Sequence, residues 1–152
     1  MVDWQTPFEE IPVGQGRQLC DGDEVAILTI GHVGNFATKA IEELETYSIA
    51  HYDMRFVKPI DEHLIRSPAS SHHLLVTLEE NTISGGAGSA VTEFLSNEGI
   101  VMPVMQLGLP DRHVDHGSHA EQLADIGLDP DSIHGAISQR LELLKIPAQA
   151  SQ

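Results

Sequence analysis

The order of apolar and polar positions predicts strands and helices in alternation along most of the chain. A nearly unbroken apolar run at 24–31 is typical of a strand buried on both faces of a sheet. From residue 35 to about 46 the apolar residues recur at intervals of three and four, which predicts a helix. By the same criteria, further strands are expected at 17–20, 48–54, 73–79 and 101–107, and a helix begins at 87.

Capping residues predict where three further helices begin. Asp61 is placed to cap a short helix, which should end by about Ser67 because Pro68 disfavours helical geometry in the residue before it. Ser118 with Glu121 matches a capping box. The dipeptide at 129–130, Asp-Pro, matches an N-cap followed by proline in the first helical position.

This alternation predicts an α/β fold with a mainly parallel sheet of five strands and helices on both faces. A turn signal at 21–23, Asp-Gly-Asp, joins the first strand tightly to the second, so the first strand should run antiparallel at an edge, as in a hairpin. Residues 1–16, rich in proline and glycine, are predicted to be a linker or N-terminal arm, 17–146 the domain and 147–152 a tail.

Composition narrows the class of protein. The 152 residues suit one domain, 41% of them are hydrophobic, and no apolar run approaches the roughly 20 residues that span a bilayer. The first residues lack the features of a signal peptide, and the single cysteine, Cys20, excludes an internal disulfide. These features predict a cytoplasmic protein.

The balance of charge excludes two kinds of partner. Eight basic residues against 23 acidic ones give a net charge of −15, which opposes binding to nucleic acids and to anionic membranes. Two interpretations of the acidity remain. One is an ordinary solvated surface, and the other is a source organism with a salty interior, in which salt screens the self-repulsion.

The histidines at 113, 116 and 119 superficially match a metal site, because they recur at intervals of three among carboxylates. The helix start at Ser118 divides them, so they cannot share one helical face. A solvated loop is therefore favoured, and metal binding through His113, His116 and His119 stays the alternative.

Polar residues also follow two predicted strands, at the edge where open α/β sheets bind ligands. Glu79 and Glu80 are paired carboxylates that could do acid–base chemistry, and Asp53 could form an ion pair with Arg55. The glycine-rich turn at 85–88 lacks the lysine of a P-loop, so close packing is favoured over anion binding. No complete catalytic motif is present.

Several long motifs, in one order, resemble those of the 1-deoxy-D-xylulose-5-phosphate synthase family of transketolase-type enzymes. Residues 53–61 resemble the family's D-x-R-F-x-K-P-x-D segment, and 76–89 resemble V-T-x-E-E-N-x-x-x-G-G-A-G-S. The stretches 12–16, 107–111, 116–117 and 123–129 resemble further family motifs. The likeness runs from about residue 6 to 144, and it identifies the chain as similar to the C-terminal domain of that family.

The resemblance implies a three-layer α/β/α domain that serves dimer assembly and forms part of the wall around the active-site region. In the family, thiamine diphosphate and Mg²⁺ are bound by two preceding domains, where pyruvate is decarboxylated and condensed with glyceraldehyde 3-phosphate. This chain is therefore expected to hold no cofactor, metal or catalytic residue and to be inactive alone, with the preceding domains and a second subunit of a homodimer as partners. Residues that match the family motifs are assigned structural or interface roles: Asp53, Arg55, Glu79, Glu80, Asn81, Gly85, Gly86 and Gly88.

Two other hypotheses stay open at this stage. The chain could be a natural subunit of a split transketolase or 2-oxoacid dehydrogenase E1-type enzyme, or a stand-alone binding or assembly module. The turn at 21–23 faintly resembles the start of a thiamine-diphosphate motif, but Cys20 replaces its first glycine and the expected asparagines are missing.

The salty-interior interpretation predicts that the free energy of unfolding rises with salt concentration, because salt screens the repulsion among the acidic side chains. Urea denaturation at a series of KCl concentrations measures this. A free energy of unfolding that falls as KCl rises would refute the interpretation.

Overall fold

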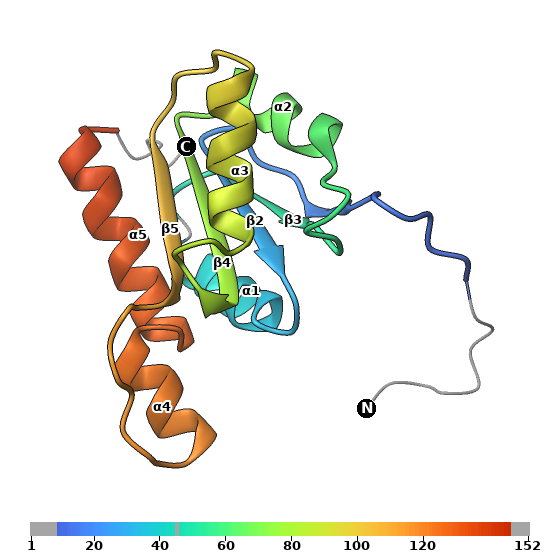
Figure 1. Ribbon diagram of the computed structural model, residues 1–152. Helices are drawn as coiled ribbons and strands as arrows, with labels where there is room; N and C mark the ends of the chain where they lie inside the picture. Colours follow the sequence, from blue (N-terminus) through green and yellow to red (C-terminus); the bar gives the residue numbers. More distant parts are fainter. Residues whose placement is uncertain (1–8, 45, 147–152) are drawn as a thin grey trace.

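The computed structural model describes residues 9–44 and 46–146, which form a five-stranded sheet covered by helices (Figure 1). The strands are β1 (Arg17–Cys20), β2 (Val25–Ile30), β3 (Ile49–Asp53), β4 (Leu74–Thr82) and β5 (Val104–Leu109). They lie in the order β1-β3-β2-β4-β5, and β1 alone runs antiparallel to its neighbour. The predicted α/β class, mixed sheet and antiparallel edge strand are confirmed.

The helices form a layer on each face of the sheet. One layer contains α1 (Gly34–Glu43), α4 (His119–Ile126) and α5 (Pro130–Leu144), and the other contains α2 (Glu62–Ser71) and α3 (Ala87–Asn97). Alternation along β4 supplies both cores: Leu74 and Val76 pack with the first layer, and Leu75 packs with the second. Each fully buried side chain of this size contributes about 1.5–3 kcal/mol to folding.

The predicted hairpin between the first two strands is wrong. β1 pairs with β3, with Arg17 opposite Asp53, and makes no ladder with β2. The reason is that both edges of β2 are already occupied by the parallel strands β3 and β4. The turn at 21–23 therefore carries the chain past β3 instead of closing a hairpin.

The predicted end of α2 near Ser67 is also wrong, because the helix continues through Pro68 to Ser71. The proline side chain is buried, and its carbonyl accepts a hydrogen bond from the backbone N–H of His72. The hydroxyls of Ser70 and Ser71 both donate to the carbonyl of Ser67. These bonds hold the last turn together beyond the proline.

Two strand boundaries differ from the predicted ones. β4 extends to Thr82, which lies opposite Leu109 after a shift in register. β5 begins at Val104, whereas Val101 is 99% exposed. Pro103 lies just before this edge strand, as expected for a residue that cannot donate to a ladder. Residues 9–16 form neither helix nor strand, and the predicted tail lies outside the described residues.

The predicted helix caps are confirmed. The Asp61 carboxylate accepts from the backbone N–H of Leu64 at 2.9 Å. Ser118 and Glu121 form a reciprocal capping box, and their hydrogen bonds lower the pKa of the Glu121 carboxyl. The Asp129 side chain accepts from the N–H of Ser132, with Pro130 at the start of α5.

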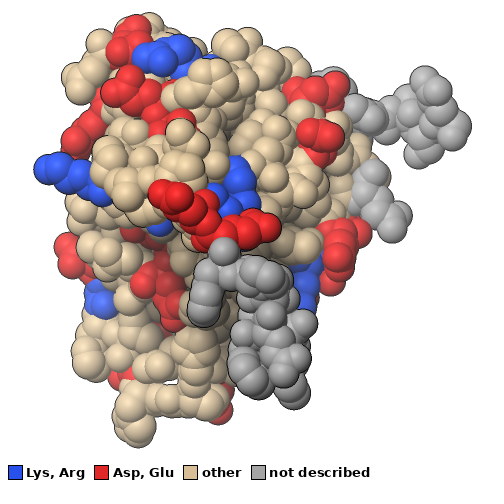
Figure 2. All heavy atoms as spheres, turned by 90° about the vertical axis from the view of Figure 1, so that its right-hand side faces the viewer, with Lys and Arg blue, Asp and Glu red and all other residues tan. Residues whose placement is uncertain are grey.

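No helix in the described part of the chain is long and apolar enough to cross a bilayer. On the face shown in Figure 2, acidic side chains are spread across the surface, with several basic side chains between them. The net charge of −15 is therefore not gathered into one acidic patch on that face.

A buried histidine lies in the middle of β3. His51 is 1% exposed, and its Nε2 lies 3.0 Å from the hydroxyl oxygen of Thr29. Because the Thr29 hydroxyl donates its own hydrogen to the carbonyl of Tyr52, Nε2 of His51 is the donor in this pair. Burial lowers the pKa of His51, against a smaller opposing effect of Asp53, so the folded protein holds it neutral.

His51 should therefore make the fold sensitive to acid. Below about pH 6.5 the imidazole of His51 is protonated in the unfolded chain, whereas in the folded chain it stays neutral down to a lower pH because its pKa is lowered. The free energy of unfolding contributed by His51 falls as pH drops from about 6.5 towards its folded-state pKa, by at most about 1.4 kcal/mol per pH unit. Urea denaturation between pH 7.5 and 5.5 measures this.

The variant His51→Gln should flatten this dependence on pH, whereas His63→Gln, a change at an exposed histidine, should leave it as it is. An equal pH dependence in His51→Gln and the wild type would contradict the assignment.

Candidate functional site

The carboxyl ends of β2 and β4 lie side by side and open onto a depression of about 400 Å³. Ligands of open α/β sheets bind at this edge. Five of the residues singled out by sequence line the depression: Glu79, Glu80, Asn81, Gly85 and Gly86. The end of β2 contributes Ile30, Gly31 and His32 to the same wall.

Glu79 is a buried carboxylate that closes the N-terminus of α3. Its side chain is directed into the interior, and the residue is 3% exposed. One carboxylate oxygen accepts from the backbone N–H of Ala87 at 2.8 Å, and the other accepts from that of Gly88 at 2.9 Å. These are two of the amide groups that a helix start leaves without partners, and the negative charge also favours the positive end of the helix dipole.

Two glycines are required by this arrangement. A Cβ atom on Gly86 would collide with the Glu79 carboxylate and with the carbonyl of Thr82. A Cβ atom on Gly88 would lie 2.5 Å from the hydroxyl oxygen of Thr77. The glycine-rich turn therefore lets α3 approach β4 closely, which supports the packing interpretation of this motif.

Glu80 is directed to the opposite face of the sheet, because successive residues of a strand alternate. Its Oε2 accepts from Nδ1 of His32 at 2.8 Å, and its Oε1 accepts from Nε2 of His119 at 2.9 Å. The three side chains come from the end of β4, the loop after β2 and the start of α4. Glu79 and Glu80 are thus on different faces and do not act as a pair.

The three regularly spaced histidines do not come together. His119 lies on α4 against Glu80, whereas His113 and His116 lie in the exposed loop that precedes the helix. Nε2 of His113 lies 3.9 Å from a carboxylate oxygen of Asp115, and the His113 side chain is 89% exposed. The helix start at Ser118 separates the set, as the sequence predicts.

Asp53 and Arg55 are held in a small ion-pair network at the end of β3. Asp53 accepts from Nε of Arg17 at 3.1 Å and from the backbone N–H of Arg55 at 3.1 Å, and the Arg55 side chain lies 3.9 Å away. Arg55 has a φ of 57°, an uncommon conformation for a residue with a side chain. The hydrogen bond from its backbone N–H to the Asp53 carboxylate helps to hold it there.

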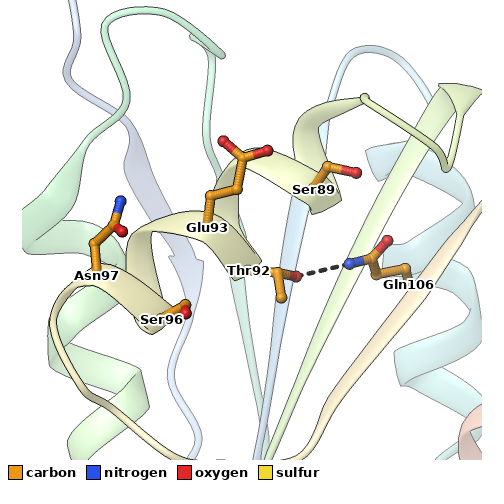
Figure 3. A pocket seen from close by; sticks show the side chains of 6 residues that line it. All are labelled: Ser89, Thr92, Glu93, Ser96, Asn97 and Gln106. Carbon is orange, nitrogen blue, oxygen red and sulfur yellow. Dashed lines mark hydrogen bonds between the residues drawn. The ribbon is translucent and has the colours of Figure 1, made fainter.

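A second hollow, of about 550 Å³, lies along α3 next to β5 (Figure 3). Its lining is polar, and the amide nitrogen of Gln106 donates to the hydroxyl oxygen of Thr92 at 2.7 Å. Glu93 is its one ionisable residue. A single carboxylate does not make an acid–base pair, so the edge at β2 and β4 is the stronger candidate.

These features define an α/β domain in which the motif residues Asp53, Glu79 and Glu80 are engaged in internal bonds. The chain belongs to the transketolase C-terminal domain family: the family model for "Transketolase, C-terminal domain" matches residues 14–133. This confirms the family expected from the sequence motifs.

Curated relatives refine the comparison. The 1-deoxy-D-xylulose-5-phosphate synthase of Cytophaga hutchinsonii is 48% identical over 135 residues, covering 88% of this chain and 21% of that protein. The synthase of Pseudomonas fluorescens strain Pf0-1 is 49% identical over 137 residues, with 90% and 21% covered. The chain thus spans about a fifth of the length of these relatives.

Solved structures agree on the fold. One is a split-gene transketolase whose structure is described as an "inactive beta4 tetramer", where beta4 is not the strand β4 of this chain. It is 31% identical with a TM-score of 0.80, and the match covers 89% of this chain and 45% of that one. The transketolase of Campylobacter jejuni is 11% identical with a TM-score of 0.62, covering 83% and 18%. The latter supports the fold alone.

His32 was not singled out by sequence reasoning. It lies 48 positions before Glu80 and 87 before His119, so no local spacing connects the three. A signal was nevertheless present. His32 follows directly after the strand at 24–31, and adjacent parallel strands bring their carboxyl ends together.

The Glu79 contact predicts a stability difference between neighbouring carboxylates. Glu79→Gln replaces one acceptor oxygen with an amide group that cannot accept, so a buried backbone N–H of α3 loses its partner. We expect the free energy of unfolding to fall by about 2–3 kcal/mol. Urea denaturation near pH 7.5 measures it.

The matched control is Glu80→Gln on the adjacent, more exposed position, for which a change below about 1 kcal/mol is expected. Equal losses from the two variants would contradict the role given to Glu79.

Proposed function

We propose that this chain is the C-terminal assembly domain of a thiamine-diphosphate-dependent enzyme of the 1-deoxy-D-xylulose-5-phosphate synthase type, and that it is inactive alone. The whole enzyme would join pyruvate to glyceraldehyde 3-phosphate with loss of CO2. The observation that carries the proposal is sequence identity to such synthases. About nine-tenths of this chain is 48–49% identical to a segment that makes up about a fifth of their length.

The arrangement of the motif residues supports an assembly role. Glu79, Gly86 and Gly88 join β4 to α3, and Asp53 joins β1 to the segment after β3. Groups that are engaged in internal bonds serve the fold rather than a reaction. This supports structural roles for Asp53, Glu79, Gly86 and Gly88 among the eight residues assigned from the family motifs.

Exposed apolar side chains support contact with further protein. Ile11 and Val13 lie on the N-terminal arm and are 51% and 73% exposed, and Val57 lies on the loop after β3. The arm reaches this loop, because the N–H of Gly16 donates to the carboxylate of Asp61 at 2.9 Å. Clustered apolar surface is typical of interaction sites, and we infer that the preceding domains or a second subunit cover these three side chains.

The described residues do not fit thiamine diphosphate with Mg²⁺. Magnesium prefers oxygen ligands, whereas the one group of three potential ligands in the described ranges contains two histidines. At the 21–23 turn, Asp21 accepts from the side chain of Gln18, and the N–H of Asp23 donates to Ser48, so the turn serves local structure. We therefore infer that the cofactor is held by other parts of the enzyme.

A second candidate function is that of a subunit of a split enzyme. The specific observation in its favour is the TM-score of 0.80 and 31% identity to a split-gene transketolase. In this case the chain would assemble with a separate cofactor-binding chain. The two candidates agree that the chemistry requires additional protein.

The proposal predicts that the chain alone neither binds thiamine diphosphate with Mg²⁺ nor consumes pyruvate. Mixing it with a polypeptide that contains the cofactor-binding regions of its source enzyme should restore synthase activity. Calorimetric titration measures the binding, and release of CO2 from pyruvate with glyceraldehyde 3-phosphate measures the activity.

The full-length synthase of Cytophaga hutchinsonii is a positive control for both assays. Tight, Mg²⁺-dependent cofactor binding by this chain alone would contradict the proposal. A separate cofactor-binding chain that co-purifies from the source organism would favour the split enzyme.

A further inference from the structure

We propose that His32, Glu80 and His119 form a binding site for one divalent transition-metal ion of the zinc type. The proposal does not depend on the function proposed above. It rests on three potential ligands that converge from three separate segments of the chain.

The spacing of the ligand atoms suits a metal ion. One nitrogen of each imidazole and a carboxylate oxygen of Glu80 all lie within 4.8 Å of one another. In a tetrahedral zinc site, bond lengths of about 2.0–2.2 Å place neighbouring ligand atoms about 3.3 Å apart. His32 now lies 2.8 Å from Oε2 of Glu80 and His119 lies 2.9 Å from its Oε1. A single ion would therefore be held by both oxygens, or by one of them after a rotation of the carboxylate.

The scaffold holds the ligands in place. Glu80 lies on β4, which is bonded to neighbours on both sides. The ring of His32 packs edge-on against Phe36 of α1, with 5.6 Å between centroids. The rings of His32 and His119 are 5.8 Å apart and inclined at 32°, so both present a nitrogen to the same carboxylate. Glu80 on the sheet and the packed ring of His32 therefore lose little freedom when an ion binds.

The donor set selects the class of metal. Two imidazoles and one carboxylate suit zinc and its neighbours, whereas magnesium and calcium prefer oxygen ligands. Three protein ligands also leave a fourth position open, as in zinc sites that hold water or a substrate. That position can open to solvent, because the side chains of His32 and His119 are 53% and 60% exposed.

Two hollows border the site. On one side is the depression of about 400 Å³ that includes His32 and Glu80. On the other is a smaller one of about 220 Å³, lined by Glu80, His119 and apolar residues of α4 and β5. A small anionic or carbonyl-containing ligand in either hollow would be within reach of the metal's open position.

The ion would also hold α4 against the sheet. This helix buries a single residue, Leu123, and the loop before it is exposed. His119 is at its first position, so a bond from His119 to the metal would connect the helix directly to β2 and β4. Metal binding should therefore raise the thermal stability of the domain.

The test is titration of the chelator-treated, full 152-residue chain with ZnCl2 by calorimetry at pH 7.5. We expect one ion per chain. The variants His119→Ala and Glu80→Gln should each bind at least about tenfold more weakly. Co²⁺ should give visible absorption bands of a four- or five-coordinate centre, and these bands should be lost in both variants.

The matched control is the double variant His113→Ala/His116→Ala, which removes the two histidines of the exposed loop that precedes α4. It should bind zinc as the wild type does and show the same rise in melting temperature with ZnCl2. Because all three proposed ligands are partly exposed, their variants should fold, and circular dichroism checks this.

Three outcomes would overturn the proposal. The first is zinc binding by the wild type that is no tighter than binding by His32→Ala/His119→Ala. The second is a loss of binding that follows His113 and His116 instead. The third is the absence of any stoichiometric binding, which would leave the three side chains as a hydrogen-bonded group only.

Discussion

The carboxylate of Glu79 at the start of α3 is the contact on which this edge of the molecule depends. A charged side chain that is 3% exposed is costly to bury unless its oxygens are satisfied, and the amides of Ala87 and Gly88 satisfy both. The same bonds provide partners for the first amides of the helix. One side chain thus meets two requirements that would each oppose folding if left unmet.

The position of Glu79 also determines what its neighbours can do. Because residues of a strand alternate between faces, a buried Glu79 places Glu80 on the other face, beside His32 and His119. Close approach of α3 requires glycine at 86 and 88. A motif of two glutamates and several glycines, which could be taken for a catalytic or anion-binding sequence, is therefore explained by packing on one face and a histidine cluster on the other.

Most of the architecture could be predicted from the sequence, because local signals encode it. The apolar run of β2, the capping residues Asp61, Ser118 and Asp129, and the strand–helix alternation each act within a few residues. One error arose where distant contacts decide: β1 joins β3 because β2 has no free edge. The other arose at Pro68, where serine hydroxyls of the same turn and burial of the proline ring support the end of α2. Two of the three residues of the histidine–glutamate cluster, Glu80 and His119, could be singled out from the sequence. Their contact with His32 could not, because it depends on the order of the strands in the sheet.

Amide hydrogen exchange of Ala87 and Gly88 measures how firmly Glu79 holds the N-terminus of α3. If both N–H groups donate to the buried carboxylate, they should exchange as slowly as amides in the core of β4, despite lying in the first turn of a helix. Exchange as fast as that of the exposed loop at 111–117 would contradict the account.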